Sequence, residues 1–142
     1  FTAENCPNIE ELCAKSDIIS IHTNLTSKTK ELINFKILKQ MKNKCPIIIN
    51  TSRGEVINQA DLLVALDKNY ISGCGLDVTH PEPLPGNHPL LLHPRVITTP
   101  HIGSATITAR NDMAHSAAIN LIESFSPQPK GHFVVNILEN KS

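Results

Sequence analysis

Short apolar runs alternate with segments of helical periodicity along most of this chain. The runs are five to seven residues long, several of them rich in Ile, and they have the length and composition of strands; they lie at 17–22, 46–50, 72–78 and 95–99. Apolar residues at helical spacing predict one helix before the first run, at 9–16, and others between and after the runs, at 34–41, 60–69 and 104–125. This alternation predicts βαβ units, a parallel sheet and right-handed crossovers, and therefore an α/β fold.

Polar and breaking residues set the expected limits of these elements. Asn8 is placed to cap the first helix, and Asn58 with Asp61 three positions later resembles an N-cap pair. The segment 80–94 (HPEPLPGNHPLLLHP) is too rich in proline to predict regular helix. The breaker SPQPKG at 126–131 is followed by HFVVNIL, which has an extended pattern.

Composition excludes several classes of partner. The chain has 13 Lys and Arg against 13 Asp and Glu, so it has no basic surplus with which to bind nucleic acid or an acidic membrane. No apolar run reaches membrane-spanning length. Its four cysteines form no C-x-x-C pair, which is typical of a reduced intracellular protein. We therefore expect a soluble cytoplasmic protein whose partners are neither nucleic acid nor membrane.

All four predicted strands end in polar or ionisable residues. In open parallel sheets, ligands bind outside the carboxyl ends of the strands, so these residues are expected to share one edge. The residues concerned are His22, Thr23 and Asn24; Thr51, Ser52 and Arg53; Asp77; and Pro100, His101, Gly103 and Ser104. One polar strand end means little, but four that converge with different chemistry indicate a site.

The ionisable residues near that edge suit the reduction of a 2-oxo acid. A carboxylate such as Glu82 beside the imidazole of His101 would stabilise the protonated ring, which can then serve as a general acid. The guanidinium of Arg53 can hold a substrate carboxylate through two parallel hydrogen bonds. No side chain supplies a hydride, so this chemistry requires a nicotinamide cofactor.

Each of these residues also has a purely structural interpretation. Arg53 could be a solvated loop residue, Glu82 could keep a proline loop soluble, Asp77 could end a strand, and His101 could be a satisfied histidine near the core. The convergence of all four at one edge favours the site. His80, His88 and His93 match no metal-ligand spacing, so we expect no metal. Gly73 and Gly75 predict the close approach of a neighbouring backbone or ligand rather than a phosphate-binding turn.

Three motifs in order, NTSRG at 50–54, GLDV followed by PEP at 75–83, and PHIGS at 100–104, resemble the D-isomer-specific 2-hydroxyacid dehydrogenase family. The segment LDVTHPEPLPGNHPLL is similar to sequences of the family's glyoxylate/hydroxypyruvate reductase branch. The resemblance extends from the first helix to about residue 125. It implies that Arg53, Glu82 and His101 are catalytic, with Arg53 also binding substrate.

The resemblance further implies residues that contact cofactor and substrate. Asp77 matches the position at the nicotinamide end of NAD or NADP, and Thr51 and Gly103 match positions that bind cofactor. Ser104 matches a substrate-lining position. Asn24 stands in the cofactor loop where a proline is frequent in the family.

The family's nucleotide domain opens with a strand and a G-x-G-x-x-G turn, and neither occurs in this chain. The resemblance therefore implies a Rossmann-like domain that lacks its first βαβ unit. Residues 1–125 would form the C-terminal portion of the NAD(P)-binding domain, and 126–142 a tail that returns to a substrate domain. We expect an exposed apolar surface on such a sheet, and little turnover by the chain alone.

Three functions remain open at this point. The first is an NAD(P)-dependent reductase of small 2-oxo acids such as glyoxylate or hydroxypyruvate, which in this family is usually a homodimer. The second is a non-catalytic, corepressor-like relative that binds dinucleotide. The third is an inactive truncated form. Retention of Arg53, Glu82 and His101 in order favours the reductase.

Overall fold

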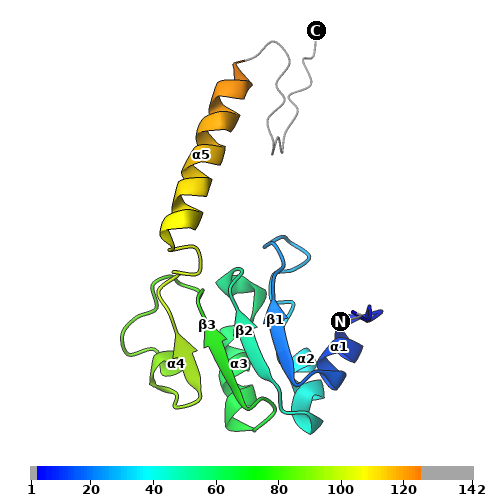
Figure 1. Ribbon diagram of the computed structural model, residues 1–142. Helices are drawn as coiled ribbons and strands as arrows, with labels where there is room; N and C mark the ends of the chain where they lie inside the picture. Colours follow the sequence, from blue (N-terminus) through cyan, green and yellow to red (C-terminus); the bar gives the residue numbers. More distant parts are fainter. Residues whose placement is uncertain (1–2, 126–142) are drawn as a thin grey trace. The chain divides into compact units, whose positions relative to one another are not determined.

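The computed structural model describes residues 3–125, which form two compact units that divide after Ile102. The first unit contains a four-stranded parallel sheet in the order β1-β2-β3-β4 (Figure 1). The strands are β1 (Ile18–Ile21), β2 (Ile47–Asn50), β3 (Gly73–Leu76) and β4 (Val96–Thr98). Each lies within a predicted run, so the predicted parallel α/β fold is confirmed.

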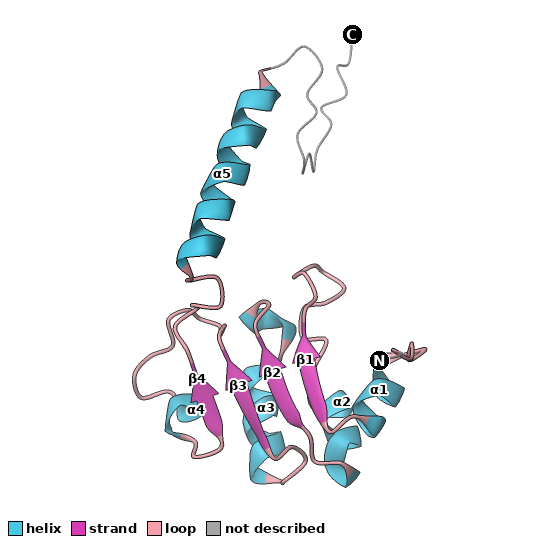
Figure 2. Ribbon diagram, viewed as in Figure 1, coloured by secondary structure: helices cyan, strands magenta, loops and turns pink. Residues whose placement is uncertain are grey.

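Helices α1 (Ile9–Lys15), α2 (Phe35–Gln40) and α3 (Gln59–Asp67) lie together on one side of this sheet (Figure 2). The predicted caps are present, because Asn8 accepts a hydrogen bond from the Glu11 amide and Asn58 accepts one from the Asp61 amide. Short 3₁₀ turns follow α2 (η1, Met41–Asn43) and β2 (η2, Gly54–Val56). The second turn matters for the site, because it begins directly after Arg53.

The two faces of the sheet differ in exposure. Apolar side chains on the helix side form the core, and they include Ile19, Ile48 and Leu76. On the other face, Ile18, Ile47 and Ile97 keep 66%, 42% and 73% of their surface exposed. The expected exposed apolar surface is therefore found on the face opposite α1, α2 and α3.

The expectation that the segment 80–94 contains no regular helix is wrong. Residues Pro89–Leu92 form the one-turn helix α4 beside β4 (Figure 2). Pro89 occupies the first turn, where its missing N–H costs nothing, and His88 caps the turn by accepting a hydrogen bond from the Leu90 amide. The buried Leu90 then anchors the turn to the core.

Gly73 has the close contact predicted for it. A Cβ atom there would lie 2.9 Å from the carbonyl oxygen of Arg95, which belongs to the segment entering β4. The bare backbone of Gly73 thus lets the two strands pair at their start.

The second unit contains α5 (Ile107–Ser124), within the predicted range 104–125. Its N-cap is Thr106, whose side chain accepts a hydrogen bond from the Ala109 amide. The predicted tail 126–142 lies outside the described residues. None of the helices in residues 3–125 combines the length and the apolar character that crossing a bilayer requires.

Two of the four thiols, those of Cys13 and Cys74, are buried. Burial raises the pKa of Cys74 to about 12 and, aided by the nearby Glu10 carboxylate, raises that of Cys13 to about 11. Since the thiolate is the nucleophile, we expect both to resist Ellman's reagent at pH 8 in the folded chain, whereas the half-buried Cys6 and Cys45 react first. Mass mapping of the labelled thiols checks this, and early labelling of Cys74 would contradict it.

Candidate active site

His101 follows β4 after only two intervening residues, and its backbone is unusual. Its φ angle of 52° lies in the left-handed region, which non-glycine residues seldom occupy. The amide of His101 donates to the carbonyl oxygens of Asp77 and Thr99, both at 3.0 Å. A left-handed residue that the surrounding chain fixes in this way is typical of a functional site.

The carboxylate of Asp77 organises the segment that carries His101. Only 8% of Asp77 is exposed, and its Oδ1 accepts hydrogen bonds from the Thr99 hydroxyl at 2.5 Å and from the Ile102 amide at 2.9 Å. These bonds bracket the histidine on both sides. Sequence reasoning assigned Asp77 to the cofactor and did not single out Thr99, because nothing in the local pattern pairs two residues that lie 22 positions apart.

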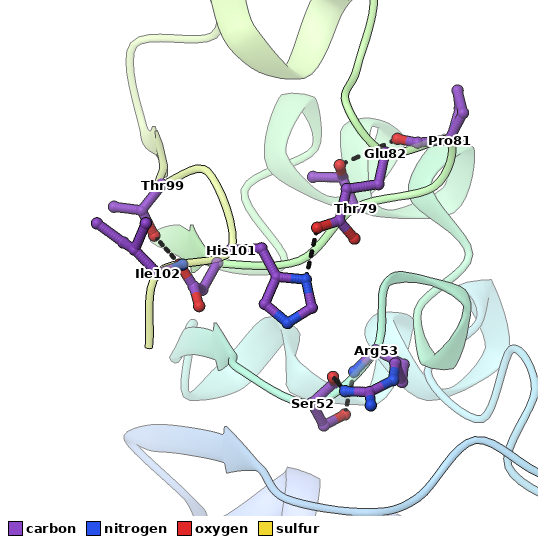
Figure 3. Close-up of polar contacts among 9 residues, drawn as sticks. Ser52, Arg53, Thr79, Pro81, Glu82, Thr99, His101 and Ile102 are labelled. Carbon is purple, nitrogen blue, oxygen red and sulfur yellow. Dashed lines mark hydrogen bonds and ion pairs between the residues drawn. The ribbon is translucent and has the colours of Figure 1, made fainter. Parts of the chain in front are cut away.

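Glu82 contacts the imidazole directly. Its Oε1 lies 2.6 Å from Nδ1 of His101, and both side chains are partly exposed (Figure 3). An ionised carboxylate can only accept a hydrogen bond, so Nδ1 carries the hydrogen of this pair. The second ring nitrogen, Nε2, is then the atom through which the ring can exchange a proton with a ligand.

Arg53 follows β2 in a turn built around a buried amide. Asn50 is 1% exposed; its Nδ2 donates to the Arg53 carbonyl oxygen at 3.0 Å, and its Oδ1 accepts from the Ser52 amide at 3.0 Å. The Arg53 guanidinium donates to the Ser52 carbonyl oxygen at 2.6 Å. In the view of Figure 3, the His101 ring has Glu82 on one side and Arg53 on the other.

Gly54 ties the Arg53 turn to the segment that leads to Glu82. A Cβ atom on Gly54 would lie 2.1 Å from both the carbonyl carbon and the carbonyl oxygen of Thr79. Real Cβ atoms do not approach backbone so closely, so only glycine fits. The turn after β2 and the segment after β3 are therefore packed backbone against backbone.

The predicted site residues of the first unit line two cavities at the carboxyl ends of the strands. A cavity of about 440 Å³ is lined by residues that include Asp77, Glu82 and His101. A cavity of about 410 Å³ is lined by Asn24, Thr51 and Arg53, together with His22, Thr23, Leu25 and Ser52. Gly103 and Ser104 belong to the second unit. The roles of all the predicted site residues stay predictions.

The ends of three adjacent strands carry hydrogen-bonding groups of the kind that hold the polar parts of a dinucleotide. Hydroxyl, amide and carboxylate groups from Thr51, Asn24 and Asp77 follow three adjacent strands. Within residues 3–125, no three His, Cys, Asp or Glu side chains cluster as metal ligands would.

Comparisons with known proteins identify the family. The family model "D-isomer specific 2-hydroxyacid dehydrogenase, NAD binding domain" matches residues 2–103. The chain is 50% identical over 115 residues to a glyoxylate reductase of Thermofilum pendens, and the matched region covers 81% of this chain and 34% of that protein. It is 47% identical over 119 residues to the human glyoxylate reductase/hydroxypyruvate reductase, and this match covers 84% of this chain and 36% of the human protein.

A solved structure agrees with these sequence matches. The NADPH-dependent glyoxylate/hydroxypyruvate reductase of Sinorhizobium meliloti, in complex with NADP and malonate, superposes with a TM-score of 0.78 at 31% identity. The match covers 86% of this chain and 38% of that one. The chain thus spans about a third of the length of the curated relatives it matches. It belongs to the NAD-binding domain family of the D-isomer-specific 2-hydroxyacid dehydrogenases.

Proposed function

We propose that this chain supplies the proton donor and the carboxylate-binding arginine of an NAD(P)-dependent reductase acting on small 2-oxo acids such as glyoxylate or hydroxypyruvate. The observation that carries the proposal is the contact of 2.6 Å between Glu82 and His101, at the sheet edge where Arg53 follows the neighbouring strand β2. The names of the relatives support the choice of substrate class.

The proposed roles follow from the chemistry of each group. Arg53 binds the substrate carboxylate through its forked N–H groups and so fixes the orientation of the 2-oxo group. Glu82 accepts the hydrogen of Nδ1 and stabilises the imidazolium form of His101. Nε2 of His101 then donates its proton to the carbonyl oxygen, which becomes the hydroxyl of the product, and the reverse reaction returns that proton.

The reduced cofactor, NADH or NADPH, would supply the hydride when bound and leave as NAD+ or NADP+. Asn24, Thr51, Asp77 and Gly103 are proposed to hold it, and Ser104 to line the substrate. We also propose that the full-length protein acts as a homodimer in the cytoplasm.

A chimera tests this function. Residues 1–125 replace the corresponding segment of the Thermofilum pendens glyoxylate reductase, and oxidation of NADH and of NADPH is followed with glyoxylate and with hydroxypyruvate. We expect turnover by the chimera with at least one combination of cofactor and substrate, and little or none by the 142-residue chain assayed alone. If the folded chimera binds dinucleotide but never turns over, the reductase is contradicted and the non-catalytic relative that binds dinucleotide is favoured.

Substitution of Arg53 separates substrate binding from proton transfer. Gln at this position keeps hydrogen-bonding ability but removes the charge and the fork. Hydrogen bonds between charged groups are worth about 1.5–3 kcal/mol, so we expect the KM for glyoxylate in the chimera to rise roughly 10- to 150-fold. The KM for the reduced cofactor serves as the control and should change far less. An unchanged glyoxylate KM would show that Arg53 does not bind the carboxylate.

A further inference from the structure

Gln59, the first residue of α3, holds the backbone of the segment that carries Glu82. Its Oε1 accepts a hydrogen bond from the His80 amide at 2.9 Å, and its Nε2 donates to the His80 carbonyl oxygen at 2.5 Å. His80 precedes Glu82 by two residues. We propose that Gln59 is a positioning residue for Glu82, and through Glu82 for the imidazole of His101; its effect on turnover rests on the proposed function.

The segment needs such a contact because of its composition. Pro81, Pro83 and Pro85 have no backbone N–H, so few donors remain with which the segment could join a ladder or a regular turn. His80 and Glu82 are both exposed, and burial therefore does little to fix them. The Gln59 side-chain amide pairs with both the N–H and the C=O of His80, as the backbone of a neighbouring strand would in a sheet.

The other end of this contact is firmly placed. The amide of Asn58 donates to the carbonyl oxygen of Ile33 at 3.0 Å, and the Asn58 side chain caps α3. Leu62, one turn along the helix, is fully buried. Within the proline segment, the Thr79 hydroxyl donates to the Pro81 carbonyl oxygen at 3.1 Å, a bond that ties the segment only to itself. Gln59 projects from a fixed helix start and joins this segment to α3.

The consequence for the site is geometric. The pair formed by Glu82 and His101 joins two partly exposed side chains 19 residues apart, so its geometry depends on where the segment 79–82 lies. A misplacement of about 1 Å at a catalytic group can cost up to about 100-fold in rate. Arg53 is placed by its hydrogen bond from Asn50, and the packing of Gly54 against the Thr79 backbone remains when Gln59 is replaced, so substrate binding should be spared.

The first experiment needs no turnover. In the 142-residue chain, long-range ¹H–¹⁵N spectra follow the ring nitrogens of His101 in Gln59→Met, Glu82→Ala and the double variant. Gln40→Met, the same change at a glutamine of α2, is the control. We expect Gln59→Met to move the Nδ1 signal at least halfway to its position in Glu82→Ala, and to add nothing in the double variant. A ring spectrum identical to that of the unsubstituted chain would overturn the proposal.

The second experiment asks what the contact does for catalysis. In an active chimera, Gln59→Met should lower kcat about 10-fold while changing the KM for glyoxylate less than 2-fold, and it should have no further effect when Glu82 is already Ala. An additive loss in the double variant would overturn the route through Glu82. A chimera that never turns over would count against the proposed function, whereas the ring spectra would still decide whether Gln59 positions Glu82.

Discussion

Replacement of His101 by Asn should lower kcat of the chimera about 10²–10⁴-fold, the usual contribution of a general acid. Asn cannot supply the proton that Nε2 of His101 donates. It does tolerate the φ of 52° found at this position better than most residues, so the turn between β4 and Ile102 should persist. The KM for glyoxylate should change little, because Arg53 still binds the carboxylate.

The matched control is His115→Asn, the same substitution at an exposed histidine of α5. It should keep the full kcat. Steady-state kinetics measures both variants, and a ¹H–¹⁵N correlation spectrum verifies that the strands remain paired. A folded His101→Asn variant that retains more than a tenth of kcat would show that the proton comes from another group.

Gly54→Ala should lower the free energy of unfolding. Extra carbon atoms in a well-packed site typically cost roughly 1–3 kcal/mol, and we expect a value at the upper end of that range. The new Cβ would meet the Thr79 carbonyl group at 2.1 Å, and this neighbour is backbone that cannot rotate away. Either the turn after β2 or the segment after β3 must move. Because Arg53 precedes Gly54 and Glu82 lies close after Thr79, we expect the KM for glyoxylate to rise and kcat to fall.

Gly86→Ala provides the comparison, since a Cβ atom at Gly86 has no atom within 4 Å. It should be neutral, or stabilising by about 0.4–1 kcal/mol through the unfolded state. Urea unfolding of the 142-residue chain gives both free energies. Equal stability of the two variants would mean that the contact between Gly54 and Thr79 is not tight in solution.

The strands and most helices were predictable because local chemistry specifies them. Apolar runs such as PIIIN lie on a central strand, and Asn8 and Asn58 cap helices because their side chains accept hydrogen bonds from the first turn. α4 was missed because prolines on both sides obscure a single turn in which Pro89 is at a tolerated position.

The site was predictable in part. The convergence of strand ends follows from a parallel sheet, and the contact between Glu82 and His101 agrees with what the family resemblance implies. The contacts made by Gln59, Gly54 and Thr99 could not be foreseen. Each joins residues that lie more than 20 positions apart, and no periodicity marks them.

The order of the sheet has a consequence for how the chain folds. Each strand pairs with the one before it: Ile18 with Ile47, Ile47 with Gly73, and Cys74 with Val96, which are separations of 29, 26 and 22 residues. Each pairing therefore closes a segment of fewer than 30 residues, and the entropic cost of closure is similar for the three steps. We expect strands to join in the order of synthesis, so that Arg53 is placed first, Glu82 next and His101 last. Of the three proposed catalytic residues, the proton donor would then be the last to reach its place during translation.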